Sequence, residues 1–270
     1  MKFNDNDITG LYYSGHTIVR AYGCDGKLVF GEAPYVPPFT DKFQYTTSGN
    51  SYTIACNSSS ELDRINDIIT SLVRIGGHTS AITECIVGDC VTKINNNCFN
   101  QWTSLTSITI SQSVRTIDYG AFYYCTNLPT LIIPSGVTVI QSNMCESCIY
   151  LANTNIPSGV TEIQNDAYHD CLSLLDITIP ASVTTIGDDA FRARSWTTEP
   201  QRTLMQRMNA NRVVRVLATT PPTLGTGVFS ITSGEPDFAS YPIYVPAESL
   251  NAYKTATNWS VYANRIFPIE

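Results

Sequence analysis

The sequence predicts a β-rich solenoid, a stack of 23-residue units with short helical turns, together with a small N-terminal β module. Two observations lead to this fold class. Apolar residues recur with a 23-residue period through the middle of the chain without a gap, which marks a repeat array. Each unit is also too short to bury its own apolar face, so successive units have to stack on one another.

The repeat runs through four complete units, 91–113, 114–136, 137–159 and 160–182, and a fifth opens at Val183. Valine holds the first position of these units, isoleucine the fourth and twentieth, and leucine the fifteenth. These columns are predicted to fill the interior, together with columns at the ninth and twelfth positions. The core ladder predicted from the last two columns comprises Phe99, Phe122, Tyr168, Phe191, Cys125, Cys148 and Cys171.

Every unit contains the same predicted elements in the same order. The alternation Leu-x-x-Ile-x-Ile, as at 105–110, predicts a strand because its residues are β-branched and alternate. Proline follows this strand in three units, where a missing backbone donor does least harm. A turn leads to a second short extended piece, Val-Thr-x-Ile, and 120–125 is predicted as one turn of α- or 3₁₀-helix. One unit therefore forms one coil.

The pattern Val-Thr-x-Ile-Gly-x-x-Ala-Phe-x-x-Cys-x-x-Leu-x-x-Ile-x-Ile-Pro-x-Ser resembles the BspA-like (Treponema-type) leucine-rich repeats of bacterial surface proteins. Residues 183–191 are its closest single match, and the resemblance covers about residues 84–270. A decayed half unit at 218–229, then a strand, short helix and tryptophan at 243–259, resemble the family's usual ending. The resemblance implies a right-handed leucine-rich-repeat-like stack and an interaction role, and it implies no reaction and no particular ligand.

Residues 1–32 are predicted to form a separate β meander with strands at 8–13, 17–22 and 27–30. A unit of this size is too small to be stable alone, so we expect it to attach the chain to a partner or to pair in a homo-oligomer. It resembles short N-terminal modules on repeat proteins of gut bacteria and their phages. The proline-rich residues 33–41 are predicted as a stiff linker.

Residues 42–90 are predicted to cap the stack, because a solenoid needs atypical ends that hide its open apolar faces. A hairpin with strands at 43–47 and 51–55 precedes a serine-capped amphipathic helix at 60–69. The repeats are assigned to 91–191. After an insertion at 192–215, residues 216–270 are predicted as a degenerate repeat and a C-terminal cap.

The insertion at 192–215 holds six arginines and a single acid, Glu199. One interpretation is a solvated inserted loop, and the other is a basic protrusion that binds an acidic partner, a glycan or a neighbouring subunit. In the second interpretation the partner-binding residues are Arg192, Arg194, Arg202, Arg207 and Arg212.

Tyrosines crowd a second stretch. Tyr119, Tyr123 and Tyr124 lie in one unit, and Tyr150 and Tyr168 lie in the next two. Either their rings are ordinary, partly packed solenoid surface, or the first three form a partner-binding patch, since aromatic residues are enriched at interfaces.

Composition limits the classes of partner. The formal net charge is −7 and only 14% of residues are charged, whereas nucleic-acid-binding proteins carry a basic footprint. No apolar run is long enough to span a membrane, and no signal peptide lies within this numbering. We therefore expect an extracellular-facing protein, on a virion or a bacterial cell surface, that binds no nucleic acid and does not insert directly into a membrane.

The chain has nine cysteines, and Cys145 and Cys148 match a Cys-x-x-Cys pattern. Both occupy interior columns, so core packing is preferred to a metal or redox site. The cysteines at the twelfth position recur one coil apart, which is within reach of a disulfide. Because their side chains are expected to lie parallel in an apolar layer, free thiols are preferred.

Little in the sequence points to catalysis. His169 lies two residues before Cys171 but is expected to face outward while the cysteine faces inward, so they form no nucleophilic pair. The nucleophile elbow, phosphate loop, zinc-protease and dinucleotide motifs are absent. We expect no enzyme activity, no catalytic residue, no metal site and no cofactor.

The sequence therefore predicts a non-enzymatic, surface-exposed structural or binding protein that displays a polar face to a protein or glycan. One hypothesis is a phage or prophage virion component, in a fibre or tail. The alternative is a secreted or cell-surface bacterial adhesin that binds host proteins. An enzyme is the third hypothesis, and it would show turnover on a glycan or peptide panel that is lost when His169 is replaced.

Overall fold

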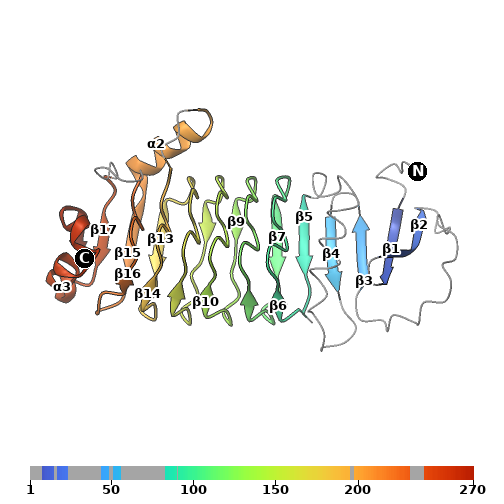
Figure 1. Cartoon of the computed structure of the whole chain (residues 1–270), viewed down its shortest axis with the longest axis horizontal. Helices are drawn as coiled ribbons and strands as arrows, with labels where there is room; N and C mark the ends of the chain where they lie inside the picture. Colours follow the sequence, from blue (N-terminus) through green and yellow to red (C-terminus); the bar gives the residue numbers. More distant parts are fainter. Residues whose placement is uncertain are drawn as a thin grey trace.

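The computed structural model describes the backbone of four strands before residue 56, and residues 83–89, 91–194, 198–231 and 240–270 in full. The fully described part is an elongated stack of coils (Figure 1). The predicted strand at 27–30, the linker at 33–41 and the helix at 60–69 lie outside the described residues. Three of the nine cysteines, Cys24, Cys56 and Cys90, and two of the three histidines, His16 and His78, also lie outside the described residues.

Two predicted hairpins are confirmed. β1 (Ile8–Ser14) pairs antiparallel with β2 (Thr17–Gly23), and β3 (Gln44–Ser48) pairs antiparallel with β4 (Ser51–Ala55). β4 also pairs in parallel with β5 (Glu84–Val87), the first strand of the stack. The second hairpin therefore covers a sheet edge that would otherwise be open.

The fold class predicted from the repeat is confirmed, because each coil contributes one strand to each of two parallel rows. Partners in the rows, such as Cys85 with Ile108 and Ile94 with Ile117, are 23 residues apart. The first strand row continues from β5 with β7 (Ser107–Ile110), β9 (Thr130–Leu131), β11 (Asn153–Thr154), β13 (Asp176–Ile179), β15 (Val213–Val216), β17 (Ile243–Val245) and β18 (Ile266–Pro268). The second strand row contains β6 (Lys93–Ile94), β8 (Thr116–Ile117), β10 (Val139–Ile140), β12 (Glu162–Ile163), β14 (Thr185–Ile186) and β16 (Thr223–Leu224).

The segment predicted as a helical turn is instead a pair of tight turns bonded to the next coil. The amide of Tyr123 donates to the carbonyl of Gly120 at 2.9 Å, three residues back, as in a 3₁₀ turn. The alternate amides of Phe122 and Tyr124 donate to the following coil at 2.9 Å each. Gly120 and Tyr124 have φ of 60° and 58°, and this left-handed backbone stops the turn from continuing as a helix. The turns therefore add a third ladder between coils.

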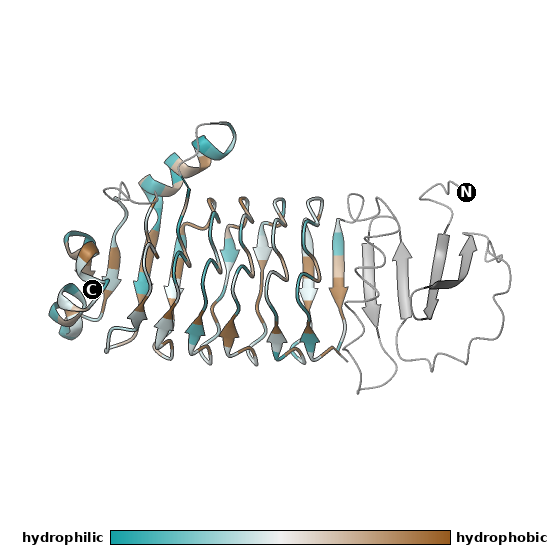
Figure 2. Cartoon of the chain, viewed as in Figure 1, coloured by the Kyte–Doolittle hydropathy of each residue, from teal (hydrophilic) through white to brown (hydrophobic). Residues whose placement is uncertain are grey.

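The interior is filled by the repeated apolar columns, and Figure 2 shows apolar residues recurring on every coil. All seven residues of the predicted core ladder are at most 1% exposed. Phe99 stacks on Phe122 with ring centroids 5.2 Å apart, and Tyr168 stacks on Phe191 at the same separation. Cys145 stands in the same column between the two pairs and is fully buried.

The cysteines at the twelfth position act as buried hydrogen-bond donors. The thiols of Cys125, Cys148 and Cys171 donate to the carbonyl of the ninth residue of the preceding coil at 3.0, 3.1 and 3.2 Å. All six cysteines of the described residues are free. Burial raises the pKa of Cys145 and Cys171 well above the ordinary value, so these thiols stay protonated at neutral pH.

The C-terminal end of the stack is closed by η2 (Ala247–Ser249), α3 (Leu250–Thr255) and η3 (Ser260–Arg265). Trp259 is fully buried beneath them, and its indole donates to the carbonyl of Pro222 at 2.8 Å. Its ring meets that of Tyr253 edge to face at 4.8 Å. None of the helices in the described part of the chain combines the length and hydropathy that a bilayer crossing requires.

The insertion is not the plain loop of the first interpretation. It contains α2 (Gln201–Asn211), which projects from the stack in Figure 1, and it ends in β15 of the first strand row. Asp176 pairs with Val213, so partners here are 37 residues apart rather than 23. The extra residues leave the stack as helix α2, and the chain then re-enters the first strand row with β15 paired in parallel to β13 without a register shift.

Candidate functional site

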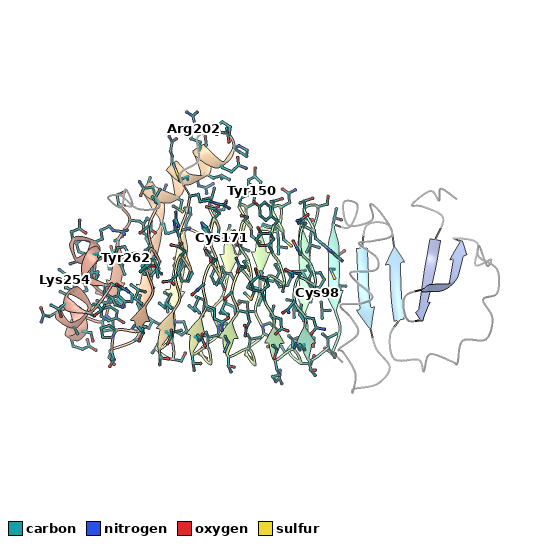
Figure 3. All side chains as sticks on the ribbon, viewed as in Figure 1. Cys98, Tyr150, Cys171, Arg202, Lys254 and Tyr262 are labelled. Carbon is teal, nitrogen blue, oxygen red and sulfur yellow. The ribbon has the colours of Figure 1, made fainter. Side chains whose placement is uncertain are left out.

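The turns at positions six to twelve of successive coils line up along one side of the stack, here called the turn edge. Because the period is constant, Tyr124, Ser147 and Asp170 hold the eleventh position of three consecutive coils. In the next coil Arg194 follows at the twelfth position, where the insertion leaves the stack. Figure 3 shows Tyr150 on this side of the stack, with Arg202 on the projecting helix beyond it. The turn edge thus gathers residues from both predicted partner-binding groups.

The tyrosines of the predicted patch lie on the turn edge. Tyr119 is 48% exposed, and Tyr123 and Tyr124 are half-buried with ring centroids 4.7 Å apart. The pKa of Tyr123 is raised, chiefly by burial and then by the charge of Glu146. Tyr168, in contrast, is buried in the core and presents no surface. Tyr119, Tyr123 and Tyr124 therefore remain available to a partner.

Arg194 joins these tyrosines to a buried carboxylate. Its backbone amide donates to Asp170 at 2.6 Å, and its guanidinium also pairs with the fully buried Asp170 side chain. A second guanidinium nitrogen donates to Ser147 at 3.2 Å, and the phenol of Tyr124 is a further partner. Burial works against the charge of Arg194, but the hydrogen bond and charge of Asp170 outweigh it and raise the pKa of Arg194. Arg194 therefore anchors the start of the insertion as well as lining the edge.

His169 does not face outward as the sequence suggested. It is only 8% exposed, with Nδ1 3.1 Å from Asp166 and 3.9 Å from Glu146. Its Nε2 lies 3.9 Å from Asp170 and has no hydrogen-bond partner. Cys171 points inward and donates to a backbone carbonyl, so the two side chains form no nucleophilic pair. The imidazole is thus buried among three carboxylates from the turns.

Replacing Asp166 by asparagine is expected to flatten part of the pH dependence of stability. Burial raises the pKa of Asp166, against the opposing effect of His169. A raised pKa stabilises the fold fully below the ordinary aspartate value, about 3.9, and this contribution is lost as pH rises through the raised value. Asn97 and Asn143 hold the same position with the same positive φ, so the backbone tolerates the change.

The measurement is the free energy of unfolding in urea for both proteins across that pH window. The difference, native minus variant, should fall as pH rises. A difference that stays constant or increases with pH would contradict the role given to Asp166.

The arginines of the insertion do not share one environment. Arg192 pairs with Asp189 at 2.8 Å, and Arg202 pairs with Glu199 at 2.7 Å while remaining half exposed. Arg207 is exposed on α2. Arg212 contradicts the prediction of a partner-binding residue, because it is 2% exposed. Its guanidinium donates to three backbone carbonyls inside the stack, those of Leu174, Phe191 and Cys171, at 2.9, 3.0 and 2.8 Å.

The acidic members of the turn edge were missed from the sequence. Two of them could have been found from their position in the repeat. The seventh position of every coil holds asparagine, glycine or aspartate, the residues that best tolerate positive φ. Asp166 and Asp189 belong to that column, and the network forms where the column turns acidic. The described residues contain no group of three or more His, Cys, Asp or Glu side chains placed to hold a metal ion.

Comparison with known proteins gives one family match. The sequence model of the BspA type Leucine rich repeat region matches residues 77–197 in six copies. No curated protein matches the chain.

Among solved structures, a leucine rich cell surface protein from Faecalibacterium prausnitzii A2-165 is 24% identical, with a TM-score of 0.38. The match covers 60% of this chain and 52% of that protein, so the chain spans about half of its length. The T. pallidum Leucine Rich Repeat protein is 21% identical, with 71% and 86% of the two chains covered and a TM-score of 0.43. A leucine-rich repeat protein from Eubacterium ventriosum ATCC 27560 is 14% identical, with 77% and 78% covered and a TM-score of 0.30.

Proposed function

We propose that this chain, whose residues 77–197 are a BspA-type leucine-rich repeat region, is a non-enzymatic binding protein displayed on a surface. It contacts a protein partner through the turn edge and the projecting helix α2. The surface is that of a virion or of a bacterial cell. Antibodies against the turn edge should label intact phage particles or intact cells, and labelling only after lysis would contradict display.

The observation that carries this proposal is the meeting of aromatic and basic side chains on one side of the stack. Tyr119, Tyr123 and Tyr124 offer rings that are partly held by packing, so they lose little freedom on binding. α2 adds Arg202 and Arg207 and contains no acidic residue, although the chain as a whole has a net charge of −7. Tyrosine and arginine are among the residue types enriched at the positions that carry most of the binding energy of protein interfaces. The partner surface that faces α2 is acidic.

The test begins with a panel of host proteins presented to the immobilised full chain. For a protein that binds, Tyr123→Ser with Tyr124→Ser should lower affinity at least about tenfold, because anchor residues of this kind typically contribute more than 1 kcal/mol. Arg202→Ser with Arg207→Ser should lower affinity and also flatten its dependence on salt, since exposed charges are screened by ions. The matched control is Arg115→Ser, an exposed arginine outside the turns. Unchanged affinity in both double variants would overturn the assignment of the turn edge.

A further inference from the structure

The backbone ladder of the first strand row is interrupted between β7 and β9 and again between β11 and β13, where the hollow described below lies. β11 pairs only with β9, and β13 pairs only with β15. Within the described residues 151–180, no backbone hydrogen bond joins the two strands. The same two coils remain bonded elsewhere, as where Thr184 donates to the carbonyl of Thr161 at 2.9 Å. The coils therefore stay stacked while the row opens on one face.

Two residues of the third unit distinguish the interruption between β11 and β13 from the one between β7 and β9. The eighteenth position holds Ile108, Leu131 and Ile177 in the other units, but Thr154 in this one. Thr154 is smaller and more polar than these residues, so less of the interior is filled here. The hydroxyl of the buried Tyr168 is directed at Thr154, which places a polar pair where other coils have only apolar groups.

Asn155, at the next position, ties its strand to the preceding coil. Its side-chain oxygen accepts from the amide of Ile133 at 2.6 Å, and its side-chain nitrogen donates to the carbonyl of Ile133 at 2.9 Å. This amide takes the place of a strand backbone on the side of β9. Over the same described stretch, residues 151–180, no comparable side chain bonds the backbone of β13, so the space on that side is left open.

A hollow of about 510 Å³ lies at the opening. This volume is within the range of sites that bind small molecules, roughly 300–1,000 Å³. Leu174, Ile177 and Phe191 line it and are buried, whereas Ile132 lines it and is 53% exposed. Ile156, which also lines it, is only partly buried, although the isoleucines at its position in the other units are buried. The hollow therefore combines a buried apolar floor with an accessible aliphatic wall.

The polar groups around the hollow include donors and acceptors but no free charge. The side chains of Asn153, Thr154 and Thr178 line it. Asp176 is the charged residue of the lining, and Arg215 pairs with it at 2.6 Å.

The backbone of β13 adds to these groups. Leu175 and Ile179 direct their carbonyls at the β15 side, so Asp176 and Thr178 direct their amides and carbonyls at the opening. The groups around the hollow therefore suit a ligand that both donates and accepts hydrogen bonds and carries no charge.

We propose that this hollow binds a neutral sugar residue of a glycan. Each sugar hydroxyl is both donor and acceptor, which suits the mixed amides, hydroxyls and backbone groups of the rim. The C–H face of the ring packs on Ile132 and Ile156. The site is separate from the turn edge and goes beyond the protein contact proposed there, so either proposal can fail while the other stands.

The test uses the folded full chain with galactose, mannose and N-acetylglucosamine oligosaccharides as probes, and sialyllactose as the acidic counterpart. Saturation-transfer NMR and calorimetric titration report binding. The neutral probes should bind and the acidic probe should bind at least tenfold more weakly. Thr154→Ile, which places the residue of Ile108 and Ile177 in the hollow, should abolish binding. Asn153→Ala removes an exposed rim amide without touching the core and should weaken binding at least fivefold.

Two controls separate this site from other effects. Thr109→Ile makes the same change as Thr154→Ile on an exposed position of β7 and should leave sugar binding intact. Tyr123→Ser with Tyr124→Ser alters only the turn edge and should also leave it intact. The proposal is overturned if no neutral probe binds, if sialyllactose binds equally well, or if Asn153→Ala and Thr154→Ile bind as the native chain does. It is also overturned if an uncharged extended peptide of alternating threonine and valine occupies the hollow and the sugars do not.

Discussion

Replacing Arg212 by alanine is expected to lower the free energy of unfolding by about 3–5 kcal/mol, because it removes the donor to three buried carbonyls. Each buried acceptor left without a donor costs roughly 1–3 kcal/mol. Among the described residues, the carbonyl of Cys171 alone keeps another amide donor, that of Leu174 at 3.2 Å. The side chain also lies against the ring of Tyr241, with its guanidinium carbon 5.4 Å from the ring centroid, so packing is lost as well.

Arg212 does for the fifth coil what cysteine does for the preceding ones. In three coils a thiol at the twelfth position bonds the carbonyl of the ninth residue one coil earlier. The coil that follows Phe191 has no cysteine, since Cys171 is the last cysteine of the chain, and the guanidinium of Arg212 donates to the Phe191 carbonyl instead. The side chain therefore closes the stack where the insertion has opened it.

The measurement is urea unfolding of the native chain and of Arg212→Ala, with Arg207→Ala as the matched control. Arg207 is an exposed arginine of the same segment, and its loss should change stability by less than about 0.5 kcal/mol. Arg212→Lys should recover little, since one ammonium cannot reproduce the fork of a guanidinium. Equal stability of the Arg212→Ala and Arg207→Ala proteins would contradict the stabilising role assigned to Arg212.

The stacking of the coils could be predicted from the sequence because one period controls both rows of strands. A 23-residue spacing of Val, Ile and Leu columns places each residue beside its counterpart, as the pairing of Ile140 with Ile163 shows. The same period brings Tyr124, Ser147 and Asp170 together on the turn edge. Wherever the location of a residue in the fold depends only on its position within the repeat, that location can be predicted from the sequence.

The structure of the insertion could not be predicted in this way because its residues have no counterparts 23 residues earlier or later in the chain. Arginine is mostly exposed in proteins, so a segment with six arginines suggests a solvated loop. Arg212 is the exception because its partners are carbonyls 21, 38 and 41 residues earlier in the chain. No column of the repeat predicts these contacts, and the return of β15 into register is a property of the folded stack.

The opening between β11 and β13 was also not predicted from the sequence, for a different reason. Thr154 and Asn155 are visible in the sequence as departures from the Ile and Thr columns of the first strand row. Their effect on the strand row depends on contacts between coils, since Asn155 bonds the backbone of Ile133 in another coil. The sequence therefore shows where the repeat pattern is broken, whereas the hollow that results is visible only in the structure.

Replacing Phe122 by alanine is expected to destabilise the chain by about 3–5 kcal/mol, because it opens a cavity in the centre of the stack. Phe122 is fully buried, and its ring lies nearly parallel to that of Phe99, at 8°. On its other side the same column holds Cys145, whose smaller side chain cannot fill the space. Thermal and urea unfolding should both report the loss.

The control is Tyr119→Ala, which removes a comparable ring that is 48% exposed and should cost less than about 0.5 kcal/mol. A stack of repeats is stabilised mainly by contacts between neighbouring coils, so a cavity at Phe122 weakens both interfaces of its coil. Unfolding of Phe122→Ala should therefore become less cooperative as well as easier, with a broader transition. An unchanged midpoint would mean that the ring does not contribute to the core at this position, which would contradict the register on which the ninth column rests.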